Sequence, residues 1–280
     1  MRPPEQRAAR TLALCADDFG LAPGISAAIA RLAQAQRLTA VSCITNSAYW
    51  VADAPLLGTF PASVDAGLHI NLTDGEPLSR SLAKIWPRLP ALAALVLRSH
   101  LGLLPRNALR IEVQAQLAAF RTATGAAPAY IDGHQHVHHL PGLRNIILEM
   151  AEQVQPRPAV RNTARVLGPG FGFKRWMIMH TGAPALAREL SRRMFSRNPA
   201  LLGAYDFRDP DYRALMQGWL NQLPSEGGLL FCHPGQSTIG GPTDPVAGAR
   251  ERELAYLGSD AFTQDLAAAN VRLGRVWRNT

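Results

Sequence analysis

The chain has 280 residues, of which 47% are hydrophobic and 18% are charged, so its composition is that of a folded globular protein. This length is typical of one large α/β domain, and we expect a single domain over residues 1–280. The three cysteines stand apart in apolar stretches without a CxxC pair. This spacing argues against a disulfide framework and against a cysteine-based zinc site.

The formal net charge of +8 is concentrated in two segments. Residues 77–111 contain six basic side chains and no acid, and residues 156–198 contain nine basic side chains and a single acid. Such segments attract polyanions or anionic lipid headgroups, or they form an ordinary solvated basic surface. We expect no nucleic-acid partner, because the chain shows no recognition motif and no aromatic side chains interleaved with the basic ones.

The N-terminal residues 1–10 are polar and lack the apolar centre of a secretory signal, which predicts a cytoplasmic location. The longest apolar stretch, residues 91–104, is interrupted by charge and is too short to span a bilayer. Peripheral contact with the inner face of the membrane stays open.

Strands and helices alternate along the predicted chain. Apolar runs predict strands at 11–16, 39–45, 64–73, 129–137, 159–164, 228–232 and 271–276. Helical patterns are predicted at 23–36, 107–124, 141–155, 184–194, 210–222, 246–257 and 261–269. A basic, apolar, helix-prone insertion occupies about 79–106, and the glycine-rich, aromatic segment 166–179 is expected to be a loop or lid.

This alternation predicts a parallel sheet with right-handed crossovers. The first strand is not followed by the GxGxxG turn of a dinucleotide-binding fold, which counts against an open doubly wound sheet. We therefore expect a distorted (β/α) TIM-like barrel.

Polar side chains gather at the predicted strand ends. In a (β/α) barrel these ends meet at one face, where active sites lie. Six of the eight histidines fall in these segments. The candidate residues, in chain order, are Asp17, Asp18, His69, Asp132, His134, His136, His138, Arg161 and His233.

Imidazole and carboxylate side chains together suit a borderline divalent cation, and two histidines with one carboxylate form a hydrolytic arrangement. One aspartate of the adjacent pair could bind the metal while the other takes a proton from water, and His233 could protonate a leaving nitrogen. Structural interpretations stand beside this one. An Asp-Asp pair often caps a helix, and His69 could be an ordinary core histidine. His134, His136 and His138 would share one face only in an extended strand.

Four segments together resemble the YdjC-like carbohydrate deacetylases: ADDFG at 16–20, GLHINLT at 67–73, IDGHQHVH at 131–138 and CHPG at 232–235. The resemblance runs in order from about residue 11 to 257. It implies a distorted (β/α) barrel, one divalent metal ion (Mg²⁺ or Zn²⁺), and removal of an acetyl group from an N-acetylated amino sugar. A homodimer is also in keeping with the family.

The resemblance also implies roles for individual residues. Asp18, His69 and His134 resemble the metal ligands, and Asp17 resembles the general base. His233 resembles the general acid, and Arg161 lies where an arginine orienting the base is expected. The substrate-facing candidates are Asn71, Asp132, His136 and His138.

Other functions stay open on the sequence. One is a different metal-dependent hydrolase on the same barrel, such as a phosphoesterase, and another is a non-catalytic binder of glycans or lipid headgroups. The basic segments, with the apolar residues 91–104 and the aromatic residues 171–179, also suggest an anionic membrane surface or a lipid-linked sugar as partner.

Overall fold

The chain folds around a curled, all-parallel sheet in the computed structural model, which describes residues 8–169, 172–237 and 244–277. The strand order is β5-β4-β3-β2-β1-β7-β6, and β8 pairs with the beginning of β1. The strands are β1 (Arg10–Phe19), β2 (Ala40–Cys43), β3 (Asp65–Ile70), β4 (Tyr130–Gly133), β5 (Ala159–Val160), β6 (Leu201–Leu202), β7 (Gly228–Cys232) and β8 (Val271–Leu273).

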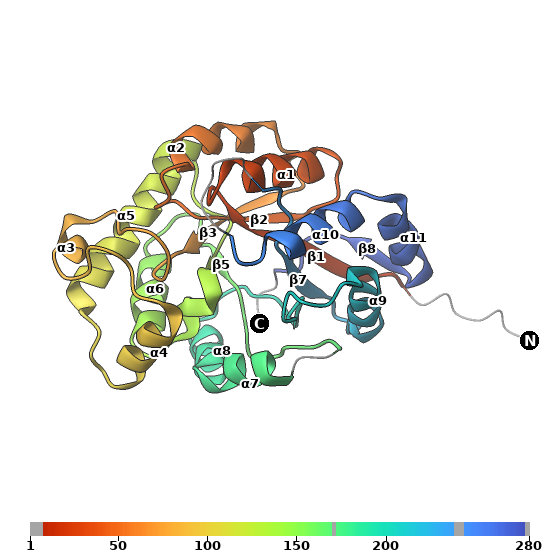
Figure 1. The fold of residues 1–280 in the computed structure, drawn as a ribbon. Helices are drawn as coiled ribbons and strands as arrows, with labels where there is room; N and C mark the ends of the chain where they lie inside the picture. The colour runs from red at the N-terminus through yellow and green to blue at the C-terminus, as the bar shows by residue number, and fades with distance from the viewer. Residues whose placement is uncertain (1–7, 170–171, 238–243, 278–280) are drawn as a thin grey trace, which may run out of the picture.

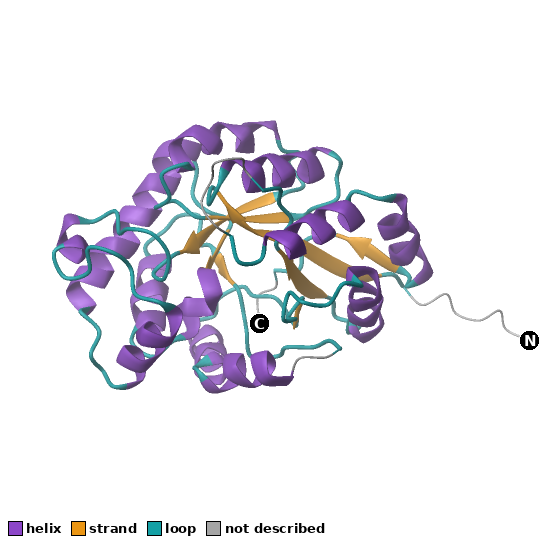
Figure 2. Ribbon diagram, in the orientation of Figure 1, coloured by secondary structure: helices purple, strands orange, loops and turns teal. Residues whose placement is uncertain are grey.

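Helices connect these strands and cover the outside of the sheet (Figure 1 and Figure 2). The larger helices are α1 (Pro23–Gln34), α4 (Leu92–His100), α5 (Arg106–Thr124), α6 (Leu143–Glu152), α7 (Gly172–His180), α8 (Ala183–Arg192), α9 (Tyr212–Gln222), α10 (Ala247–Leu257) and α11 (Asp260–Ala268). Shorter turns of helix are α2 (Trp50–Asp53), α3 (Arg80–Ala83) and the 3₁₀ helices η1 (Ala54–Thr59) and η2 (His134–His139).

The two faces of the sheet bury two separate apolar clusters, because successive side chains of a strand point to opposite faces. In β1, Leu12 and Leu14 pack into the outer cluster with the helices, whereas Ala13 and Cys15 belong to the inner cluster. The inner cluster also contains Tyr130 of β4 and residues of β2, β5, β6 and β7. The inner faces of the strands therefore enclose a packed barrel interior.

The two ends of the sheet approach each other through the segment that follows β5. Val166 forms a parallel bridge with Leu201 of β6, and Leu167 N–H donates to the Leu201 carbonyl at 2.8 Å. The predicted distorted (β/α) barrel is confirmed. β6 has only two residues and was absent from the predicted strands, because so short a run carries no periodic signal.

Two predicted elements are wrong in part. The strand expected over 129–137 ends at Gly133 and continues as η2, in which Gln135 and His136 have positive φ angles of 52° and 61°. The alternating histidines therefore do not share one extended face. The segment 166–179, expected to be a loop or lid, contains most of α7, and residues 170 and 171 lie outside the described residues.

The basic insertion at about 79–106 folds as α3 and α4, which precede α5. Within the described part of the chain, no helix is both long and apolar enough to cross a membrane.

Candidate metal and catalytic site

The period of two along each strand brings the candidate side chains to the carboxyl end of the barrel interior. Asp17 continues the inward-facing series of Ala13 and Cys15 on β1. His69 and Asp132 are register partners on β3 and β4, so they lie side by side. By the same alternation, Arg161 and His233 follow the inward-facing Ala159 and Phe231 two residues later.

Asp18 would face outward in a regular strand, but the backbone turns its side chain into the site. The register between β1 and β2 shifts between Ala16 and Phe19, and Asp18 has a φ of +70°. An irregularity of this kind re-aims a side chain, and aspartate tolerates the left-handed conformation better than most residues. Two adjacent carboxylates thus face one site, and both are buried.

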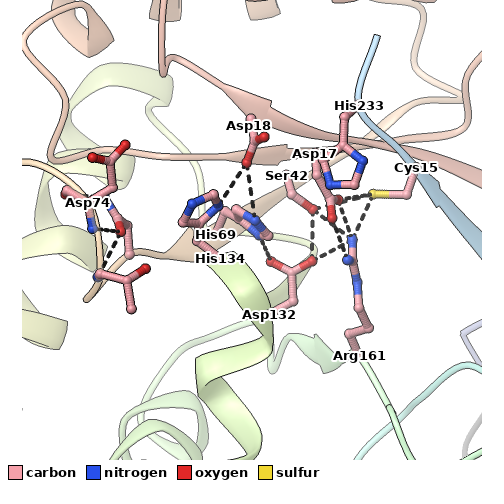
Figure 3. A network of polar contacts seen from close by, with 12 residues as sticks. Cys15, Asp17, Asp18, Ser42, His69, Asp74, Asp132, His134, Arg161 and His233 are labelled. Carbon is pink, nitrogen blue, oxygen red and sulfur yellow. Dashed lines mark hydrogen bonds and ion pairs between the residues drawn. The ribbon is translucent and has the colours of Figure 1, made fainter. Parts of the chain in front are cut away.

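Three ligand atoms converge at Asp18. Its Oδ1 lies 2.9 Å from His134 Nδ1 and 3.7 Å from His69 Nε2. Ligand atoms of all three residues lie within 4.8 Å of one another, which is the spacing of a candidate metal site. Figure 3 shows Asp18 facing both imidazoles. This donor set of two histidines and one carboxylate fits a borderline divalent cation.

The tautomer of His69 also fits a metal ligand. Its Nδ1–H donates to Asp132 Oδ1 at 2.6 Å, because the carboxylate can only accept. That bond leaves the lone pair on Nε2, the atom that faces Asp18, and such a carboxylate partner is typical of histidines that bind metals. Burial lowers the pKa of His69, but the Asp132 and Asp17 carboxylates raise it by a larger amount. The net pKa of His69 therefore lies above its ordinary value.

Arg161 joins the second aspartate to the same network. Its guanidinium donates to both oxygens of Asp17, at 2.7 and 2.6 Å, and its Nη2 lies 2.6 Å from Asp132 Oδ2. It also donates to Ser42 Oγ and Cys15 Sγ, as Figure 3 shows. Burial raises the pKa of Asp17, but Arg161 more than offsets it and holds that pKa well below its usual range.

The sequence analysis missed two residues of α10 that support the site from outside the barrel. Arg250 donates to Asp18 Oδ2 at 2.7 Å and to Asp244 Oδ2 at 2.6 Å. One turn later, Glu253 accepts a hydrogen bond from the backbone N–H of His233. Arg250 and Glu253 stand three residues apart and thus on one face of α10, but no strand-end pattern marks them.

His233 follows β7, and Figure 3 shows its imidazole beside Asp17. The ring packs edge-on against Phe207 and Phe231, with centroids 5.1 and 5.6 Å away. The structure therefore brings together Asp17, Asp18, His69, Asp132, His134, Arg161 and His233 at one end of the barrel.

The remaining candidates from the sequence are Asn71, His136 and His138, whose side chains contact other parts of the protein. Asn71 is buried, and its amide group donates to Asn46 Oδ1 and to the Asp74 carbonyl, which fixes the loop after β3. His138 is buried and lies 3.0 Å from the Arg161 carbonyl through Nε2. His136 is 8% exposed and packs edge-on against Phe231.

This chain is similar in sequence to a known protein family and to several curated proteins. The family model described as YdjC-like protein matches residues 11–268. A carbohydrate deacetylase of Homo sapiens is 32% identical, covering 65% of this chain and 56% of the relative. A chitooligosaccharide deacetylase of Proteus mirabilis is 30% identical, covering 52% and 56%. The chain thus spans about half the length of the curated relatives it matches.

A crystal structure from Enterococcus faecalis shares the fold. Its proposed activity is cellobiose-phosphate cleavage. It superposes with a TM-score of 0.71 at 19% identity, covering 96% of this chain and 98% of that one. At this identity the likeness concerns the fold alone, whereas the family match covers nearly the whole chain, including all seven clustered residues. This chain is a member of the YdjC-like protein family.

Proposed function

We propose that the chain is a metal-dependent hydrolase that removes the acetyl group from an N-acetylated amino sugar. The observation that carries the proposal is the pairing of two adjacent carboxylates with different environments. Asp18 faces two imidazoles, and Asp17 faces the Arg161 guanidinium. The names of the relatives, carbohydrate deacetylase and chitooligosaccharide deacetylase, support the substrate class.

Asp18, His69 and His134 would hold the cation. Two imidazoles favour zinc or a similar transition metal over magnesium, which prefers oxygen ligands. When bound there, a divalent cation polarises the amide carbonyl and acidifies water, which is the chemistry that amide hydrolysis needs.

Asp17 is the proposed general base. Arg161 holds both of its oxygens, which fixes the carboxylate plane and keeps the group ionised and ready to accept a proton. His233, directly after the neighbouring strand β7, is the proposed general acid that protonates the departing amine. Arg161 acts through Asp17 and is a positioning residue.

A second residue group, Asp17, His69 and Asp132, also has the spacing of a metal site. Arg161 donates to Asp17 and lies 2.6 Å from Asp132, so its guanidinium already offsets part of their charge. This arrangement supports a single cation and gives no support to a two-metal phosphoesterase. Asn71 and Asp132 are proposed to position other groups, because their polar atoms bond within the protein. His138 is proposed to do so through Nε2, which lies against the Arg161 carbonyl.

The test is acetate release from N-acetylglucosamine oligomers, measured with metal-loaded protein and after treatment with a chelator. Asp17→Asn should lower kcat by about 10²–10⁴-fold while the bound metal stays at one equivalent. His69→Ala should lose the metal. Asp260→Asn, an exposed carboxylate in the first turn of α11, is the matched control and should keep full activity.

Full activity of the Asp17→Asn variant would remove the base assignment. Metal-loaded protein that releases no acetate from any acetylated glycan would overturn the reaction itself.

A further inference from the structure

Exposed large hydrophobic side chains are concentrated in the two basic segments of the chain. Ten such side chains are exposed among the described residues, and Val51 alone lies outside residues 77–111 and 172–197. The other nine are Leu78, Ile85, Leu97, Leu101, Leu103, Ile111, Trp176, Met179 and Met194. Singly exposed apolar residues are normal, but this degree of clustering marks a surface for interaction.

The charges of the same segments are almost all positive. Residues 77–111 contain no acid, and their exposed basic side chains are Arg80, Lys84, Arg88 and Arg106. Residues 172–197 contain six basic side chains and one acid, Glu189, which pairs with Arg192 and Arg193. Apolar side chains surrounded by arginine and lysine are the composition of surfaces that bind anionic lipid bilayers.

Helix α4 shows how the apolar side chains reach solvent. Leu97 and Leu101 are one turn apart and are 60% and 61% exposed. The helix ends at His100, Gly102 then has a φ of +71°, and the N–H of Leu103 donates to the Arg98 carbonyl. This turn places Leu103, 65% exposed, directly after the same helix end.

Both segments begin at the end of the barrel that carries the site. Residues 77–111 follow β3 and residues 172–197 follow β5, the two strands that flank β4. Each contacts η2 or the turn that follows it. Ser99 Oγ of α4 donates to the Pro141 carbonyl at 2.6 Å, and Thr181 Oγ1, between α7 and α8, lies 2.8 Å from His139 Nε2. In Figure 1, α4, α7 and α8 lie along the lower edge of the view.

We propose that residues 77–111 and 172–197 form a docking face for an anionic lipid bilayer. A second copy of the chain is the less suitable occupant, because a symmetric contact would bring two strongly basic faces together. A soluble oligosaccharide as the occupant of this face would not account for nine exposed apolar side chains. Docking itself does not depend on the reaction. The further step, that the acetylated sugar is carried by a membrane lipid, rests on the proposed function.

Flotation of the full chain with vesicles tests the docking face. Vesicles of equimolar phosphatidylglycerol and phosphatidylcholine should carry the protein, vesicles of phosphatidylcholine alone should not, and added salt should weaken the binding. The triple variant Leu97→Ser, Leu101→Ser, Leu103→Ser should bind at least tenfold more weakly. Val51→Ser, 81% exposed on α2, is the matched apolar control and should bind like the unmodified chain.

The charge contribution is tested separately. Arg88→Gln with Arg106→Gln should weaken binding by about fivefold for each charge removed. Arg121→Gln with Arg272→Gln, two exposed arginines outside the docking face, should have a smaller effect.

Three results would overturn the proposal: no flotation with anionic vesicles at low salt, flotation unaffected by the leucine triple variant, or a dimer in solution that this variant dissociates. Acetate release from soluble oligomers by the triple variant keeps the two proposals apart, because the variant should lose docking and retain the reaction.

Discussion

Replacing Arg250 with methionine tests how the proposed metal site balances its charge. The guanidinium lies 2.7 Å from Asp18 Oδ2, and the two side chains are 5% and 2% exposed. Methionine keeps much of the aliphatic volume and removes the charge. Asp18 would then retain its contacts with His134 and His69 on Oδ1, while Oδ2 would lose its partner.

The size of the effect should depend on whether metal is present. Removing one partner of a buried ion pair costs about 3–5 kcal/mol, because the other charge stays buried. The metal-free variant should therefore lose about that much free energy of unfolding. A divalent cation bound at Asp18 replaces the missing positive charge, so the metal-loaded variant should lose less. By thermodynamic linkage, the variant should then bind the cation more tightly than the unmodified chain does.

Urea unfolding with chelator and with saturating zinc measures both losses, and competition with a zinc-binding dye measures the affinity. Arg213→Met is the control, because Arg213 is 49% exposed and its pair with Asp265 should contribute under about 1 kcal/mol, with or without metal. An equal loss in both conditions, or a lower zinc affinity, would refute the charge-balance argument. It would show that Arg250 acts mainly by orienting Asp18.

Two other predictions concern His138 and Arg161. Burial lowers the pKa of His138 to about 4, from an ordinary 6.5, so the unfolded chain binds a proton first as the pH falls. Between pH 7 and pH 5 this histidine should remove about 2 kcal/mol from the free energy of unfolding. Urea unfolding at both pH values should show a smaller loss for His138→Gln, and an identical loss would contradict this assignment. Arg161→Lys keeps the charge but loses the two-pronged contact with Asp17, so kcat for acetate release should fall by about 10–100-fold at unchanged metal content. An unchanged kcat would argue against a positioning role.

Most of the site was predictable from the sequence because strands have a period of two and parallel strands end together. Asp17, His69 and Asp132 follow apolar runs whose alternation points them inward. Their meeting required only that the strands be neighbours, and the sheet order β4-β3-β2-β1 makes them so. Predicting site residues from their positions at strand ends depends on backbone geometry and not on the details of side-chain packing.

The rest depended on features that carry no periodic signal. Asp18 faces inward because of one left-handed residue, and His136 leaves the strand pattern because η2 begins directly after Gly133. Arg250 and Glu253 reach the site from a helix, where an arginine and a glutamate are ordinary surface residues. Long-range partners of this type are set by how α10 packs, which the local sequence does not specify.

The number of cations that the site can hold follows from where the arginines lie. Three buried carboxylates converge at the end of the barrel, and two guanidinium groups neutralise part of their charge. Arg161 lies between Asp17 and Asp132, so a cation there would meet a positive charge already in place. Of the two oxygens of Asp18, Arg250 contacts Oδ2, which leaves Oδ1 facing the two imidazoles. The arrangement therefore leaves one carboxylate oxygen for the proposed single cation, and it keeps Asp17 apart from that cation, as its proposed role of general base requires.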